Sequence, residues 1–392
     1  MNAALILLVL AANEPVVETP VELEGWHFAG VPAFSYGSDV GLSLGAEIFL
    51  YKPLRGHPDE RDEFTIGISY ATRGPRAVDA GGSARRLFGT SLRTGLNVHV
   101  GDDPLSPYWG EGAQLGGLSV PPGFGSPPEP YRYHDRRIFA AATLRGAIAG
   151  PLGWHVRARY LNVGVREQSA LLASSDPPGA HGGRVTLGEL GLLFDSRDRE
   201  IGTHSGVFAT AAAFVAPQIN GVSDFAFHGY DAAIRFYVPL WSGGTLAARA
   251  LYDRKIAGIP SVQSATSAVP FFERTLYEGI AYNEGLGGAG TIRGIARYRL
   301  EGEEKLLGNV QLRVNLFSSH LFDKTQEYGI SAGLDAGRAQ QKGFDAVDAA
   351  GVAIGLRLIW DHAILFRIEG GRAVGHVQGA ENTLYLSFGE QF

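Results

Sequence analysis

The chain has 392 residues, a formal net charge of −6 and no cysteine, so disulfides, thiolate metal sites and a cysteine nucleophile are excluded. Its length admits one large β-domain or two ordinary domains, and its acidic balance argues against a general nucleic-acid binder. The 54 glycines follow no collagen period, and together with many aromatic residues they suit a curved β-barrel.

The N-terminal segment resembles a secretory signal. Residues 1–12, MNAALILLVLAA, form an apolar core of suitable length that lacks the usual positive start, and Ala11 or Ala12 could precede a cleavage point. A buried strand or a short anchor helix is the alternative. Residues 13–24 are acidic and contain prolines, which is typical of a linker. No run of residues approaches the ~20 apolar positions that a membrane-spanning helix needs.

From about Gly25 onward, large apolar residues alternate with small or polar ones, which predicts strands with one apolar face. Near the C-terminus, for example, Val352 and Ile354 alternate with Ala353 and Gly355. Alternation alone fits a soluble sandwich as well as an outer-membrane barrel. Strand length separates the two, because membrane strands need ~9–11 residues and ordinary strands average about 5–6. Most runs here are of the longer kind.

The strand pattern predicts an all-β fold, a transmembrane antiparallel barrel over residues 25–392. Fifteen strands can be identified, and because bacterial single-chain barrels normally have an even number, we predict sixteen, with the missing one upstream of Val100 or split from a neighbour. Short turns near residues 151–153, 242–244 and 361–362 alternate with long loops at 102–135, 167–184 and 257–304. The side on which 242–244 lies depends on the missing strand. The strands are predicted at residues 26–36, 39–52, 62–74, 85–101, 136–149, 153–166, 185–197, 206–217, 225–240, 244–256, 305–317, 327–338, 350–361, 363–372 and 381–392.

A glycine-rich loop at residues 285–290 leads to one arginine in a tight turn, Ile292-Arg293-Gly294-Ile295. Alternation places Asp335 on the inward face of a later strand. Because a charge in a partly dehydrated lumen is costly unless it is paired, we expect this long loop to fold into the lumen and Arg293 to pair with Asp335. The alternative is a solvated loop arginine.

Residues 290–317 resemble the sixth extracellular loop and following strand of the BamA/TamA superfamily, the outer-membrane barrel assembly and translocation proteins also called the bacterial surface antigen family. In that family an Arg-Gly-aromatic tip contacts an Asp in a Gly-x-Asp-x-Gly strand and a Glu on the strand after the loop. Here the Asp motif matches at residues 333–337, whereas Ile295 replaces the aromatic residue and Gln311 replaces the Glu. The implied loop lock consists of Arg293, Gly294, Asp335, Gln311 and Arg313.

Two further stretches carry the resemblance. Asp195, Arg197 and Asp198 resemble the family's Asp-x-Arg-Asp stretch at a periplasmic turn. Paired carboxylates also occur in metal and acid–base sites, but a charge-paired turn at the membrane edge is the interpretation we favour. Phe388 and Phe392 resemble the C-terminal signal by which outer-membrane barrels are recognised, which implies contact with the barrel assembly machinery during biogenesis.

The resemblance implies the outer membrane of a diderm bacterium, contact with its lipid, and assistance in inserting or translocating protein or lipid. Family members with that activity carry periplasmic POTRA domains, and about 25 residues precede the first predicted strand. We therefore expect a barrel-only member, whose client recruitment would fall to a separate periplasmic partner. The alternative is a passive channel or structural barrel that handles no client. A soluble secreted all-β protein is a third hypothesis.

We expect no enzymatic activity, cofactor, metal or nucleic-acid partner. His134-Asp135 and His204-Ser205 are hydrolase-like fragments, but a triad needs three converging groups and no Gly-x-Ser-x-Gly elbow is present. Residues 285–290 are not a dinucleotide fingerprint, because no βαβ context surrounds them. Several arginines face inward by parity, and they either favour anions in the lumen or balance inward acids such as Glu47, Asp253 and Glu369. These arginines are Arg145, Arg157, Arg159, Arg235, Arg249, Arg313, Arg357 and Arg367.

Overall fold

A computed structural model describes residues 25–38, 40–54, 57–115, 127–199, 202–277, 283–321, 324–360, 364–375, 382–388 and 391. The expected signal segment at residues 1–12, the linker at 13–24 and Phe392 lie outside these residues. Within them, no helix is long and apolar enough to cross a membrane.

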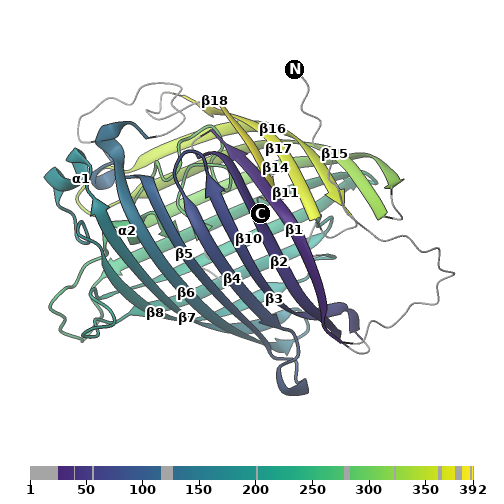
Figure 1. The fold of residues 1–392 in the computed structure, drawn as a ribbon, viewed down its shortest axis with the longest axis horizontal. Coiled ribbons are helices and arrows are strands. Elements are labelled where there is room, and N and C mark those ends of the chain that lie inside the picture. The colour runs from purple at the N-terminus through teal and green to yellow at the C-terminus, as the bar shows by residue number, and fades with distance from the viewer. Residues whose placement is uncertain are drawn as a thin grey trace.

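The chain forms a closed antiparallel barrel of sixteen strands, as predicted, in which sequence neighbours pair around the wall and β1 meets β18 (Figure 1). The barrel strands are β1 His27–Gly37, β2 Gly41–Leu54, β3 His57–Ala71, β4 Arg76–Ala84, β5 Arg93–Pro107, β6 Arg132–Ala149, β7 Leu152–Glu167, β8 Gly183–Asp195, β9 Gly206–Ala216, β10 Phe227–Trp241, β11 Gly244–Ala257, β14 Glu304–Leu321, β15 Lys324–Gln340, β16 Val347–Trp360, β17 Ile364–Val374 and β18 Asn382–Phe388. The connections carry β12 Leu276–Tyr277, β13 Asn283–Glu284, α1 Ala170–Ser175, α2 Phe271–Arg274 and 3₁₀ turns at Leu87–Gly89, Glu111–Ala113 and Glu129–Tyr131.

The strand that alternation missed is β4. Its sequence, RAVDAGGSA, places only Val78 as a large residue on the apolar face, so the period-two signal is weak. The strand predicted at residues 85–101 is therefore wrong at its start, because 85–92 form a turn and β5 begins at Arg93. With β4 in place, the turn at 242–243 falls on the short-turn side of the barrel, together with the β6–β7 and β8–β9 connections.

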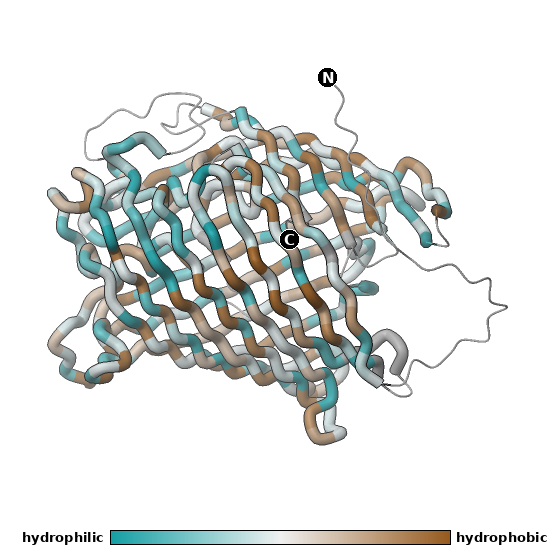
Figure 2. The backbone as a smooth tube through the Cα atoms, viewed as in Figure 1, coloured by the Kyte–Doolittle hydropathy of each residue, from teal (hydrophilic) through white to brown (hydrophobic). Residues whose placement is uncertain are grey.

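The barrel exposes its apolar face and buries its charged one. Large apolar residues on the strands point outward, and Figure 2 shows brown residues running across the near wall, with teal gathered at the end that carries α1 and α2. Ile354 and Leu334, for example, are 71% and 62% exposed. Conversely, Arg157, Arg159, Lys255 and others are among the largest fully buried side chains. This pattern is the reverse of a soluble domain and matches a wall that faces lipid.

Several inward cations pair with acids on the same inner face. Arg157 pairs with Glu189, Arg367 with Glu369, and Lys305 with Asp253. Charge balance, one of the two predicted roles of the inward arginines, is therefore met at these positions.

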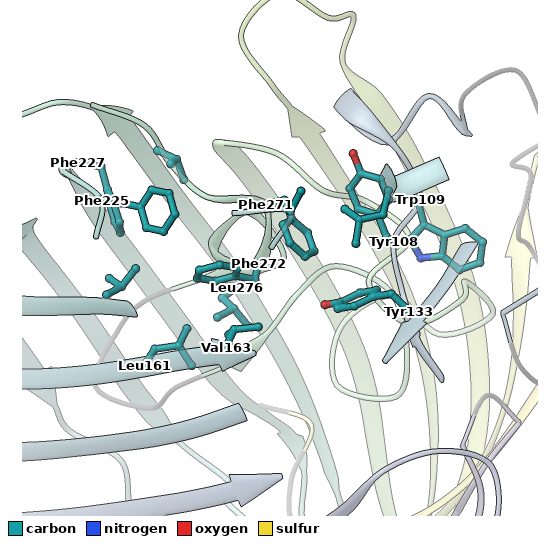
Figure 3. Close-up of a cluster of buried hydrophobic side chains, with 14 of the residues drawn as sticks. Tyr108, Trp109, Tyr133, Leu161, Val163, Phe225, Phe227, Phe271, Phe272 and Leu276 are labelled. Atoms are coloured by element: carbon teal, nitrogen blue, oxygen red, sulfur yellow. The ribbon is translucent and has the colours of Figure 1, made fainter. Parts of the chain in front are cut away.

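The long loops fold into a cap at one end of the barrel. Its core is aromatic: Phe271 of α2 lies edge-on to Tyr108 and to Tyr133, with ring centroids 5.4 Å apart in each case (Figure 3). Arg159 of β7 fixes α2 to the wall through two hydrogen bonds to Glu273, at 2.8 and 3.0 Å. The cap therefore packs on inward-facing apolar residues of the wall, such as Leu161 and Val163 of β7, and the buried Arg159–Glu273 pair ties it to the barrel.

Candidate functional site

The interior loop, residues 285–301, reaches the inner wall through a tight turn. The Ile295 N–H donates to the Ile292 carbonyl at 3.3 Å, which closes the turn around Arg293 and Gly294. Gly294 has φ +89°, a left-handed conformation that glycine adopts without steric cost. The turn therefore directs the Arg293 side chain towards β15 and β17.

Arg293 binds two carboxylates on different strands. Its backbone N–H and Nε donate to Asp335 Oδ2 at 3.0 and 2.7 Å, and Nη2 donates to Oδ1 at 2.9 Å. Its Nη1 donates to Glu369 Oε1 at 2.8 Å. All three side chains are buried, so the rigid, planar donor fork of the guanidinium is satisfied in a site that excludes water.

The other expected members of the lock form a second layer. Gln311 Nε2 donates to Glu369 Oε1 at 3.3 Å, and Arg313 Nε donates to Gln311 Oε1 at 2.9 Å. Asn309 donates to Asp335 Oδ1 at 2.7 Å. Gln311 thus supports Glu369 and Arg313 supports Gln311, so both residues act on the pair from behind Glu369.

The residue that sequence reasoning missed is Glu369. The family pattern places the second carboxylate at the Gln311 position, and here Glu369 of β17 supplies it instead. Alternation identified Glu369 as an inward acid. Alternation shows only which face of the sheet a residue is on, and not its position along the barrel axis relative to residues of other strands. The height depends on the registers of β15, β16 and β17, which the sequence pattern leaves undefined.

Burial opposes the charged form of Arg293, but the hydrogen bonds and charges of Asp335 and Glu369 outweigh it and raise the pKa of Arg293. Arg293 therefore stays cationic at any physiological pH. Ile295, which stands where the family has an aromatic residue, is fully buried in a small apolar cluster with Leu286 and Leu300. An aliphatic contact thus anchors the tip beside the ion pairs.

Glycines in the wall let the loop backbone approach. A Cβ added at Gly351 would lie 2.0 Å from the Arg293 carbonyl oxygen, and one added at Gly371 would lie 2.9 Å from the Gly294 nitrogen. Real Cβ atoms do not make such contacts. Glycine is therefore required at positions 351 and 371, because a side chain there would displace the Arg293–Gly294 turn from the wall.

The last residue of the interior loop, Glu301, is buried beneath the cap. Its Oε1 accepts from the Trp109 N–H at 3.3 Å, and Arg299 donates to the Ala113 carbonyl at 2.9 Å. Burial raises the pKa of Glu301 to about 8, against smaller opposing effects of the Trp109 N–H and nearby arginines. Burial also lowers the pKa of Arg299 to about 10. The loop exit thus holds a carboxyl that is protonated at neutral pH.

This carboxyl predicts a pH dependence of stability. The unfolded chain releases the proton near the ordinary pKa of 4.5, whereas the folded protein keeps it up to about 8. Stability from this group is thus full below about 4.5 and falls as pH rises towards 8, by at most about 1.4 kcal/mol per pH unit. In Glu301→Gln, the urea concentration at the unfolding midpoint should change less between pH 5 and 8 than in the unsubstituted protein. Glu129→Gln, an exposed cap residue, is the matched control. Equal pH slopes in the Glu301 variant and the unsubstituted protein would contradict the prediction.

The Asp195 turn is organised by its own charges. Arg197 donates to both Asp195 oxygens, at 2.9 and 2.8 Å, and stacks on the Phe208 ring at 4.5 Å. Asp198 Oδ1 accepts from the backbone N–H groups of His204 and Ser205 at 3.0 and 3.3 Å. These contacts describe a charge-paired turn between β8 and β9.

The two histidine fragments lie apart from each other. His134 pairs with Asp102 at 2.8 Å, and His204 Nδ1 contacts Thr245 Oγ1 at 2.9 Å. Among the described residues, no group of three or more His, Asp or Glu side chains could hold a metal ion. Of the C-terminal signal, Phe388 pairs with Phe366 along β17.

No protein-family model matches the chain, and no curated protein matches it. Solved structures do. BamA from Haemophilus ducreyi lacking POTRA domains 1–3 superposes with a TM-score of 0.58 at 15% identity, over 93% of this chain and 70% of that one. CdiB from Escherichia coli gives 0.61 at 13%, over 93% and 63%, and CdiB from Acinetobacter baumannii gives 0.52 at 12%, over 93% and 59%.

The chain therefore has the barrel fold of BamA and CdiB, as the resemblance of residues 290–317 predicted. It spans less than two thirds of either CdiB chain.

Proposed function

We propose that this protein is an outer-membrane barrel of a diderm bacterium that assists the insertion or translocation of proteins or lipids, and that it acts through the seam between its first and last strands. The exposed apolar wall supports the membrane location, because such a surface is stable only against lipid or another apolar partner. Membrane lipid, client chains and a separate periplasmic recruitment partner are its proposed contacts.

The seam carries the proposal. β1 pairs with β2 at eleven Cα positions, but among the described residues it pairs with β18 only at Tyr36↔Leu386 and Gly37↔Tyr385. Ser38 adds a side-chain bond, accepting from the Leu384 N–H at 2.9 Å. Along the described residues the edge is joined sparsely, and such an edge can open at low cost and pair with an incoming strand by β-augmentation.

The filled interior favours this function over a passive channel. The interior loop is held by buried ion pairs, and the cap adds a packed aromatic core at the long-loop end. Passive conduction needs a continuous aqueous path, which both features obstruct. A lateral seam needs no such path.

Locking the seam tests the proposal. The chain has no cysteine, so Tyr36→Cys and Leu386→Cys can react only with each other. Directly paired positions lie within disulfide reach, since antiparallel partners have Cα atoms about 4.5–5.5 Å apart. In liposomes, the oxidised variant should lose the ability to accelerate folding of a second barrel, and reduction should restore it.

The control joins Leu386→Cys to Ile368→Cys, its partner in the longer β17–β18 ladder. This disulfide leaves the seam unlocked, so activity should persist after oxidation. Acceleration that survives the seam disulfide would refute the seam mechanism. If the unsubstituted protein accelerates no folding but conducts steadily in a planar bilayer, the passive-channel alternative is correct.

A further inference from the structure

A hollow of ≈ 500 Å³ lies on the outer wall of the barrel, across β6 and β7. It is near the long-loop end, because β6 begins there at Arg132 and β7 ends there at Glu167, shortly before α1. Gly164 of β7 lines it opposite Arg136 of β6 and has no side chain to fill the space. Because β6 and β7 are not neighbours of β1 or β18, the hollow is separate from the seam.

The outer face changes from apolar to charged at the level of this hollow, between two neighbouring rows of cross-strand partners on β4, β5 and β6. The apolar row, whose members are all more than a third exposed, consists of Val78, Val100 and Ile138. The charged row, two residues nearer the long-loop end, consists of Arg76, Asp102 and Arg136. Figure 2 shows brown giving way to teal towards this end. In a wall that faces lipid, such a change marks the level of the headgroups.

Two arginines of the hollow, Arg136 and Arg166, are exposed, and neither guanidinium forms a hydrogen bond or an ion pair with any described residue. None of the described residues that line the hollow carries a carboxylate. Asp102, the cross-strand partner of Arg136, is already paired with Arg76 and His134, at 2.7 and 2.8 Å. The two arginines are therefore available to a ligand.

The adjoining hollow on the same outer face gives the charge balance. It shares Arg136 and Arg166, and it adds Arg76 and the acids Asp102 and Glu167. Three arginines against two acids leave one positive charge on this part of the wall. One phosphodiester group carries the single negative charge that neutralises it.

We propose that the hollow over Gly164 binds the phosphate headgroup of a membrane lipid in the leaflet on the long-loop side. The phosphate accepts from Arg136 and Arg166, because guanidinium groups bind phosphate oxygens through charge-assisted hydrogen bonds. The acyl chains of the lipid lie along the apolar row, beginning at Ile138. The inference rests on the membrane location in the proposed function and does not depend on the seam.

Phosphatidic acid and diacylglycerol with the same acyl chains are the test probes, because they differ only in the phosphate. Native mass spectrometry of the full chain in an uncharged detergent measures the lipid bound. We expect saturable binding of phosphatidic acid and none of diacylglycerol, and equal binding of the two would overturn the proposal. Arg136→Gln/Arg166→Gln should weaken phosphatidic acid binding at least about tenfold, because hydrogen bonds to charged groups are lost.

Arg254→Gln/Arg338→Gln is the matched control, since it removes two exposed arginines from the same end of the barrel, and it should leave the affinity within about twofold. Gly164→Phe keeps every charge but fills the hollow, and a Cβ there meets only the Arg136 carbonyl oxygen, at 3.8 Å. It should also weaken binding at least about tenfold. Equal weakening by the two double variants, or unchanged binding in Gly164→Phe, would contradict a site at this hollow.

Two further measurements identify the ligand and separate this inference from the proposed function. Glycerol phosphate has the phosphate without acyl chains, so it should not displace phosphatidic acid at equal concentration; displacement would assign the hollow to soluble phosphates and refute the lipid site. Flotation of the unsubstituted protein with phosphatidylcholine liposomes tests the membrane location by itself. A protein that floats but does not prefer phosphatidic acid over diacylglycerol would overturn the headgroup site alone.

Discussion

Arg293→Ala is expected to lower the free energy of unfolding by about 3–5 kcal/mol, the usual cost of removing one partner from a buried ion pair. The variant leaves Asp335 buried without the cation that it contacts, whereas Glu369 keeps its pair with Arg367. The interior loop should leave the wall, so trypsin should cleave at Arg297 and Arg299, and bilayer conductance should rise. Urea unfolding in detergent, followed by tryptophan fluorescence, measures the stability change.

Arg338→Ala is the matched control. Arg338 pairs with Asp348 at 3.0 Å, but both side chains are more than half exposed. Exposed pairs contribute about 0–1 kcal/mol, so this variant should unfold nearly like the unsubstituted protein and keep its loop protected from trypsin. Arg293→Lys should fall between the two, because an ammonium keeps the charge but cannot reproduce the donor fork. If Arg293→Ala unfolds like Arg338→Ala, the ion pairs do not hold the loop.

The sequence predicted the barrel well because alternation is a local signal that every membrane strand repeats. It failed at β4, where small residues such as Gly81 and Gly82 occupy the strand and leave little contrast between faces. The same logic applies to the lock. Asp335 was predictable from its inward parity and its motif, whereas Glu369 depends on how three neighbouring strands are staggered.

The cap was not predictable. Its core combines Tyr108, just after β5, and Tyr133, at the start of β6, with Phe271 of α2, which lies more than a hundred residues further along the chain. Strand register has the same effect elsewhere: Arg145 was identified as inward-facing, but its position opposite Arg93 appears only once the β5–β6 register is known. Periodicity therefore gives the faces of strands, while sites arise from register and from loop packing.

Gly294→Ala should release the interior loop almost as effectively as removal of the arginine. A Cβ at this position would lie 2.3 Å from the backbone of Arg372 and Ala373, and φ +89° is unfavourable for alanine. The wall backbone is held by its β-ladder and cannot yield, so the tip must move and the short bonds of Arg293 must lengthen. Strain and overpacking together predict a loss of roughly 2–3 kcal/mol in the same urea assay.

Gly290→Ala provides the control within the same loop, because a Cβ there meets no atom within 4 Å. Its effect should stay within about 0.5 kcal/mol. The double variant Arg293→Ala/Gly294→Ala gives the sharper result. If Gly294 acts by allowing Arg293 to reach its carboxylates, the two substitutions remove the same contacts. The losses in free energy of unfolding of the two single variants then add up to more than the loss in the double variant. Strict additivity would mean that the glycine and the arginine hold the loop independently, and it would contradict the coupling that we infer from their shared contact with β17.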